Sequence, residues 1–293
     1  MAETSTFDRE LEVAAAAARE AGAAILDFYN RQSVSVYEKA DGSVVTDADL
    51  ASDAIIRDRI SHAFAADPLL TEEGIDDPAR FQSRRCWIVD PIDGTQQFVD
   101  RTGEFEVLIA LVEDGRPVLG VVYQPTEDVM ITAISGHGAT LNRNGDRSPL
   151  RFAPVPEGIA PGIITSTWLG APDNLPMLNA VSASLDGAPA QVSDTSITVR
   201  RFIPPTGIAG ALIGMRVSPE AEYAWEWDLV AADAVMSEAG GALTDLFGQL
   251  HRYNKPNPRN LGGVVMSVDP RTHERVLGAL AAQRLRLLAG API

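Results

Sequence analysis

Two aspartates three positions apart, Asp90 and Asp93, end an apolar segment that begins at Cys86. The aromatic and β-branched residues between them and the start of the segment suit a buried strand. Pro91 has no backbone N–H and cannot donate to a strand ladder, so the sequence predicts that the strand stops there. The carboxylates then stand just beyond the end of a rigid element, where they could bind a cation.

The next two residues add groups that could bind an anion. Gly94 permits a tight turn. Thr95 stands where a following helix could begin, with a hydroxyl that could cap it and backbone N–H groups that could hold a phosphate. The alternative is an ordinary Asp-rich surface turn, which is common in proteins.

Further acidic residues favour a metal site over a simple turn. Glu72 and Glu73 follow the apolar pair at 69–70, and Asp228 follows Trp227 near the start of a predicted helix. Carboxylate, carbonyl and water oxygens are the ligands that Mg²⁺ prefers. Oxygen ligands from several separate elements therefore indicate a Mg²⁺ site.

Three motifs stand out, namely Glu72-Glu73, Asp90-Pro91-Ile92-Asp93-Gly94-Thr95 and Trp227-Asp228-x-x-Ala231-Ala232. Together they resemble the inositol monophosphatase superfamily of Mg²⁺-dependent, lithium-sensitive phosphomonoesterases, and the resemblance extends from about Lys39 to Gly241. Two further segments, Gly103-Glu104-Phe105 and Gly120-Val121-Val122-Tyr123, are most similar to the 3'(2'),5'-bisphosphate nucleotidases of that superfamily.

The resemblance implies a role for each of these residues. It implies that Thr95 orients and activates the attacking water, with Glu72 or Asp49 as the final proton acceptor. It also implies that Gly94, Thr95 and Asp228 contact the substrate. Roughly two or three Mg²⁺ ions would act as cofactors. Their implied ligands are Glu72, Asp90, the carbonyl of Ile92, Asp93 and Asp228.

The implied substrate is a small phosphorylated metabolite, and three hypotheses remain open. The first is hydrolysis of the 3'-phosphate of adenosine 3',5'-bisphosphate, with Arg200 or Arg201 contacting the 5'-phosphate. The second is the same chemistry on inositol monophosphate or another sugar or cyclitol phosphate, because Asp194-Thr195-Ser196 departs from the family's usual Gly-Ser turn. The third is a non-catalytic regulatory protein that keeps the fold.

The fold class predicted is α+β, and the resemblance implies a five-layered αβαβα sandwich. We expect an N-terminal half over 1–155 and a C-terminal half over 156–293, because a Pro-rich stretch lies near the boundary. Asp49 is expected to open the second helix. The predicted helices are 7–29, 49–65, 177–185, 227–239 and 271–288, and a meander of strands is predicted over 105–134.

The composition restricts the class of partner and the compartment. The chain has 293 residues and a net charge of −16, which argues against a nucleic-acid backbone or an anionic membrane as the partner. The single cysteine excludes an internal disulfide framework. With no recognisable signal segment and no long apolar run, we expect a cytoplasmic protein. Homodimerisation is an expectation from the resemblance alone.

Overall fold

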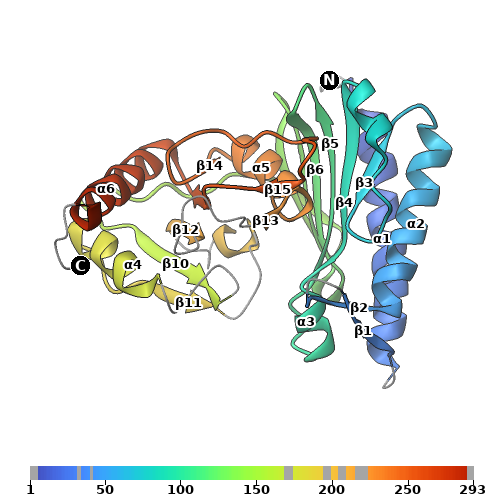
Figure 1. The fold of residues 1–293 in the computed structure, drawn as a ribbon, viewed down its shortest axis with the longest axis horizontal. Helices are drawn as coiled ribbons and strands as arrows, with labels where there is room; N and C mark the ends of the chain where they lie inside the picture. The colour runs from blue at the N-terminus through green and yellow to red at the C-terminus, as the bar shows by residue number, and fades with distance from the viewer. Residues whose placement is uncertain are drawn as a thin grey trace. The chain divides into compact units, whose positions relative to one another are not determined.

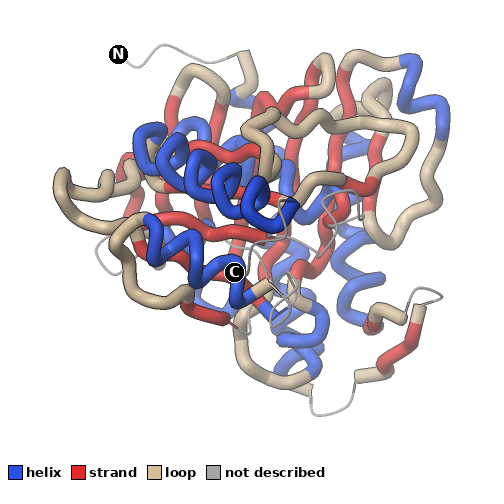
Figure 2. The backbone as a smooth tube through the Cα atoms, turned by 60° about the vertical axis from the view of Figure 1, so that its left-hand side comes forward, coloured by secondary structure: helices blue, strands red, loops and turns tan. Residues whose placement is uncertain are grey.

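The computed structural model describes residues 6–31, 34–39, 42–167, 174–193, 199–203, 209–214 and 224–288. Helices and strands both occur along the whole described chain, as the predicted α+β class requires (Figure 2). The predicted elements match the structure most closely in the first 150 residues, where helices 8–30 and 47–63 and a strand meander are found.

The chain forms two compact units whose boundaries differ from the two contiguous halves predicted. The first unit consists of Met1–Leu150, Glu226–Glu238 and Arg252–Pro258. The second consists of Arg151–Trp225, Ala239–His251 and Arg259–Ile293. The chain thus returns to the first unit twice after residue 155. The helix at Glu226–Glu238 packs on the first sheet, and in the second segment the Tyr253 N–H donates to the Gly115 carbonyl at 3.1 Å.

A seven-stranded sheet forms the centre of the first unit. Its strands follow the order β3-β4-β5-β6-β7-β8-β9, in which β3 runs parallel to β4 and every later pair is antiparallel. The Asp114-Gly115 turn joins β5 to β6 with positive φ at both residues, as a tight hairpin requires. The strands are β3 (Leu69–Thr71), β4 (Arg85–Asp93), β5 (Glu106–Glu113), β6 (Arg116–Gln124), β7 (Val129–Ile134), β8 (Gly138–Arg143) and β9 (Asp146–Leu150).

Helices cover both faces of this sheet (Figure 1). Helices α1 (Asp8–Asn30) and α2 (Asp47–Ala63) pack together and share a core with alternate residues of β5, such as Ile109. Complete burial of one such side chain contributes roughly 1.5–3 kcal/mol. Helix α5 (Glu226–Glu238) packs on the other face, where a Cβ at Gly120 would meet the Ala231 carbonyl at 2.8 Å. The close approach of α5 to β6 therefore requires glycine at this position.

Five short elements complete the described part of the first unit. The hairpin of β1 (Val36–Glu38) and β2 (Val44–Thr46) precedes α2, and α3 (Thr95–Val99) follows β4. Two 3-10 helices lie in the connections, η1 (Pro78–Gln82) before β4 and η2 (Pro125–Glu127) before β7.

The second unit is built on a mixed five-stranded sheet in the order β11-β10-β12-β16-β14. Two helices pack against it, and their apolar side chains share one core with Ile163, Ile213 and Val265. Each unit thus has helices packed on a sheet, as the predicted α+β class requires. The elements are β10 (Gly162–Ser166), α4 (Leu175–Ser184), β11 (Gln191–Ser193), η4 (Val199–Phe202), β12 (Gly210–Gly214), β13 (Ala224–Trp225), β14 (Ala242–Thr244), β15 (Arg259–Asn260), β16 (Val264–Ser267) and α6 (Pro270–Leu288).

A buried histidine in the second unit predicts a loss of stability in mild acid. The His273 ring lies between Thr244 Oγ1 at 2.9 Å and Ser267 Oγ at 3.1 Å, and burial lowers its pKa from 6.5 to about 4. Since the unfolded chain binds this proton below pH 6.5 and the folded chain only near pH 4, stability should be lost as pH falls between these values.

The measurement is urea unfolding of the wild type and of His273→Gln at pH 7.0 and pH 5.0. The wild type should lose about 1–2 kcal/mol more than the variant between the two pH values. The difference between the two proteins isolates His273 from other titrating groups. An equal loss in both proteins would show that His273 does not carry this pH dependence.

No helix in the described part of the chain combines the length and apolar character needed to cross a membrane.

Candidate active site

The predicted acidic residues gather around Asp90, near the carboxyl end of β4. Its side chain is 2% exposed. Burial raises the pKa of Asp90 well above its ordinary value, and repulsion from Glu72, Asp93, Asp228 and Asp49 raises it further. Four elements of the first unit contribute these carboxylates, so the structure brings together the acidic residues that the sequence singled out. Their mutual repulsion favours binding of a cation.

Strand β4 does not stop at Pro91, as the sequence predicted, but continues to Asp93. Its pairing with β5 is regular to Asp90, shifts register, and resumes at Asp93. This irregularity accommodates a residue without an N–H inside a strand. The Ile92 N–H donates to Asp90 Oδ1 at 3.0 Å, and Ser52 Oγ donates to the Pro91 carbonyl at 2.9 Å. The hydrogen bond from the Ile92 N–H therefore holds the Asp90 carboxylate in place.

Thr95 does not cap the following helix, contrary to the prediction. The N-cap of α3 is Gly94, whose φ of 94° lies in the left-handed region. A Cβ at Gly94 would meet the Glu104 carbonyl at 2.9 Å, so the turn requires glycine. The Thr95 hydroxyl lies 2.9 Å from Asp49 Oδ1 and 3.2 Å from the Ile92 carbonyl. Its single proton can serve one of these acceptors at a time.

Asp49 lies in the third position of α2 and does not open the helix as predicted. The helix begins at Asp47 after Thr46, which forms a capping box with Asp49. Thr46 donates to Asp49 Oδ2 from its N–H at 2.8 Å and from Oγ1 at 2.6 Å. Burial raises the pKa of Asp49, while the hydrogen bonds from Thr46 and Thr95 oppose that rise. The cap thus holds one oxygen of Asp49 and leaves the other for Thr95.

Lys39 is a site residue that the sequence analysis missed. Its Nζ lies 2.6 Å from Glu72 Oε1 and 2.6 Å from Glu73 Oε1. Burial raises the pKa of Glu73 to about 7, even though Lys39 opposes the rise. Nothing in the spacing identified Lys39, because more than 30 positions separate it from the glutamates. The Glu73 side chain is 7% exposed, so it is part of the cluster and not a surface residue.

Asp228 occupies the first turn of α5, as predicted, and is half-buried. The helix start is fixed by Glu226, which is fully buried and accepts hydrogen bonds from the N–H groups of Asn254 and Lys255 at 2.6 and 3.0 Å. Lys255 Nζ also lies 2.6 Å from Glu226. The segment 252–258 therefore positions the start of the helix that carries Asp228.

Within the described residues, no group of three or more His, Cys, Asp or Glu side chains is arranged as a ready-made metal site. Two of the gathered carboxylates accept hydrogen bonds from the protein, since Lys39 contacts Glu72 and Thr46 contacts Asp49. The chemistry of the donors nevertheless fits a hard divalent cation, since the gathered groups are carboxylate and carbonyl oxygens. The metal ligands remain predictions.

Arg200 and Arg201, the predicted contacts for the 5'-phosphate of the nucleotide, belong to the second unit. Arg200 and Arg201 are half-buried in η4, and Arg201 Nη2 donates to Ser193 Oγ at 3.3 Å. The departing segment Asp194-Thr195-Ser196 lies outside the described residues.

Comparison with known proteins gives one family and several relatives. The inositol monophosphatase family matches residues 8–285. A 3'(2'),5'-bisphosphate nucleotidase CysQ of Aggregatibacter actinomycetemcomitans is 32% identical over 243 residues, covering 81% of this chain and 85% of the relative. An inositol-1-monophosphatase of Bacillus subtilis is 28% identical, covering 81% and 86%. The crystal structure of CysQ from Bacteroides thetaiotaomicron matches with a TM-score of 0.70 and 26% identity, covering 89% and 98%.

Proposed function

The chain belongs to the inositol monophosphatase family and is a phosphoric monoester hydrolase, and on that premise we propose that it removes the 3'-phosphate of adenosine 3',5'-bisphosphate. The similarity to a bisphosphate nucleotidase over most of both chains supports this substrate. The Gly103-Glu104-Phe105 segment also supports this substrate, because it resembles the corresponding segment of the 3'(2'),5'-bisphosphate nucleotidases.

The observation that carries the proposed chemistry is the group of carboxylates around Asp90. Mg²⁺ would be held by Glu72, Asp90, the Ile92 carbonyl, Asp93 and Asp228. When bound, it would supply positive charge for the phosphoryl oxygens and for the leaving oxygen. Without a cation, the same carboxylates would repel a phosphate ester, so we propose that hydrolysis depends on Mg²⁺ and is inhibited by lithium.

Thr95 and Asp49 are proposed to activate the attacking water. The Thr95 hydroxyl can accept a hydrogen bond from that water while it donates to Asp49 Oδ1, 2.9 Å away. Asp49 would then receive the proton, and its raised pKa makes it a stronger base than an exposed aspartate. Glu72 already accepts the Lys39 ammonium group at 2.6 Å, whereas Asp49 directly contacts the Thr95 hydroxyl, so we assign the role to Asp49.

The backbone at the start of α3 is proposed to hold the phosphate. Gly94 turns the chain, and the N–H groups of Gly94 and Thr95 are the donors assigned to the phosphoryl oxygens. Asp228 is assigned to a substrate hydroxyl as well as to the cation. These contacts orient the ester, and no covalent phosphoenzyme is needed.

A second candidate substrate is inositol monophosphate, because an inositol-1-monophosphatase covers the chain almost as completely as the nucleotidase does. The two candidates share the carboxylates and Thr95 and differ only in the contacts to the remainder of the ester. Arg200 and Arg201 stay candidates for the 5'-phosphate of the nucleotide.

The test is a comparison of kcat/KM for adenosine 3',5'-bisphosphate, adenosine 3'-monophosphate and inositol 1-phosphate, all with Mg²⁺. We expect the bisphosphate to be preferred at least about tenfold over each of the others, since a charged contact to a second phosphate contributes about 1.4 kcal/mol or more. Preference for the inositol ester, or equal turnover of the two nucleotides, would refute the nucleotidase assignment and leave the carboxylate chemistry untouched.

A further inference from the structure

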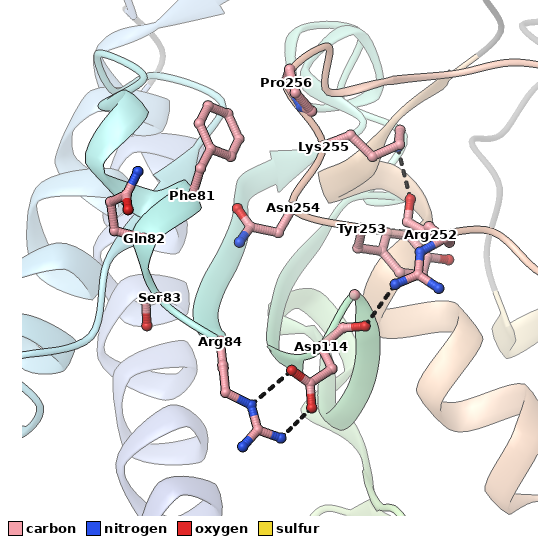
Figure 3. Close-up of a pocket in the computed structure, with 11 residues that line it drawn as sticks. Phe81, Gln82, Ser83, Arg84, Asp114, Arg252, Tyr253, Asn254, Lys255 and Pro256 are labelled. Carbon is pink, nitrogen blue, oxygen red and sulfur yellow. Dashed lines mark hydrogen bonds and ion pairs between the residues drawn. The ribbon is translucent and has the colours of Figure 1, made fainter.

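A pocket lies in the first unit near the start of β4, whereas Asp90 and Asp93 lie near the end of that strand. It has a volume of about 450 Å³, which is within the range of small-molecule sites. Its walls come from the segment before β4, the β5–β6 turn and the segment 252–256 (Figure 3). Because β4 spans Arg85–Asp93 and rises about 3.3 Å per residue, roughly 25 Å separate the Arg84 end of the pocket from Asp93. The Lys255 end is nearer to the carboxylates, since Lys255 contacts Glu226, two positions before Asp228.

Three cationic residues line this pocket in a chain whose net charge is −16. They are Arg84, Arg252 and Lys255. The only carboxylate among the lining residues is Asp114, while Lys255 contacts the buried Glu226 behind the wall. The lining is therefore locally positive on an acidic protein, and it attracts an anion.

Arg84 and Arg252 both contact Asp114, from different directions. Arg84 forms a two-pronged ion pair with the Asp114 carboxylate, with Nε at 2.8 Å from Oδ1, whereas Arg252 Nη2 donates to the Asp114 backbone carbonyl at 3.0 Å. The Arg84 and Asp114 side chains are 81% and 58% exposed. Water screens an ion pair this exposed, so the pair is weak and a ligand with two negative charges can displace Asp114 from Arg84.

The opposite part of the pocket is apolar. Figure 3 shows the Phe81 ring and Pro256 at one end, with Arg84 and Asp114 at the other and Asn254 between them. Phe81 is 38% exposed. The Arg80 guanidinium stacks on its ring, with Cζ 4.2 Å from the ring centroid. A planar apolar group can pack against Phe81 while an anionic group reaches the arginines.

The walls are held in place before any ligand binds. Arg80 is 1% exposed and donates to Asp76, to Asn254 Oδ1 at 2.6 Å and to the Lys255 carbonyl at 2.7 Å. These bonds fix the segment that carries Phe81 to the segment that carries Lys255. A Cβ at Gly115 would meet Arg252 Nη2 at 3.0 Å, so glycine leaves room for this guanidinium. A preformed pocket loses little conformational entropy on binding.

We propose that this pocket is a second binding site, separate from the catalytic carboxylates, for a small organic anion that carries a doubly charged phosphoryl-type group and a planar apolar group. The juxtaposition of Arg84 and Arg252 selects the anionic group. Phe81 and Pro256 select the planar group. The site does not depend on the substrate proposed above.

The probe is phenylphosphonate, which a phosphatase cannot hydrolyse, titrated by calorimetry into the full chain at low ionic strength with chelator present. We expect one binding event, and methylphosphonate, which lacks the ring, should bind at least about fivefold more weakly. Absence of binding by phenylphosphonate would overturn the proposal.

Two variants assign the binding to this pocket. The double change Arg84→Gln with Arg252→Gln should weaken binding at least about tenfold, whereas the matched exposed change Arg147→Gln should leave it unchanged. Unchanged affinity in the double variant would place the binding elsewhere and overturn the proposal.

A third variant changes the affinity in the opposite direction, so the test does not depend on a loss alone. Asp114→Asn removes the internal competitor for Arg84 and should tighten binding about threefold or more. Weaker binding by this folded variant would contradict the proposal, and thermal melting checks that each variant is folded.

Discussion

Replacing Asp90 with asparagine is expected to lower kcat/KM by about a thousandfold or more and to stabilise the metal-free protein. Asp90 is 2% exposed, and burial together with four neighbouring carboxylates raises its pKa. Asparagine keeps an oxygen for the Ile92 N–H, 3.0 Å away, but removes the charge that a cation needs. The loss of several kcal/mol of transition-state stabilisation corresponds to this fall in rate.

The measurement pairs steady-state kinetics with thermal unfolding in chelator. A matched control is Asp233→Asn, because Asp233 is also fully buried, has a pKa raised to about 6 by burial, and is not among the proposed site residues. The control should retain most of the activity. Wild-type turnover by Asp90→Asn would remove Asp90 from the site, and a lower melting temperature in chelator would contradict the repulsion argument.

The site could be predicted to the extent that it depends on local sequence. Asp90 and Asp93 stand out because an apolar strand leads directly to them, and Gly94 stands out because the turn there needs a positive φ. Both features are local, since a short run of residue types determines them. The structure places Asp90 and Asp93 within β4, not beyond its end, and Gly94 directly after the strand, as the sequence indicated.

Elements that depend on distant partners were predicted less well. Pro91 indicated the end of a strand, but β4 continues because the irregular pairing with β5 tolerates the missing N–H. Thr95 indicated a helix cap, but its hydroxyl contacts Asp49, 46 positions away. In both cases a tertiary contact overrides a correct local preference.

Lys39 and helix α5 show why sequence order also misleads about the larger arrangement. Lys39 contacts Glu72 across 33 positions, and no periodicity links the two. Helix α5 follows the second unit's strands in the chain but packs on β6 of the first unit, where Gly120 permits the approach. Division of the chain at residue 155 therefore separates Asp228 from the carboxylates that the structure places around Asp90.

Removal of divalent cations is expected to abolish hydrolysis, and Mg²⁺ should restore it. Without a cation, the carboxylates of Glu72, Asp90 and Asp93 repel both one another and the phosphate ester. The measurement is turnover after treatment with EDTA, followed by titration with Mg²⁺ and then with lithium, which should inhibit. Undiminished turnover in excess chelator would exclude the proposed mechanism.

Thermal unfolding tests the same expectation without measuring activity. A cation that binds only the folded chain stabilises it by about 2.7 kcal/mol at one hundred times its dissociation constant. Mg²⁺ should therefore raise the melting temperature of the wild type and of Asp233→Asn above that in NaCl of equal ionic strength. Asp90→Asn should lose most of this increase, because it removes the buried carboxylate around which the others gather while leaving the surface charge of the protein almost unchanged. An equal increase in all three proteins would assign Mg²⁺ binding to the acidic surface and not to the carboxylates around Asp90.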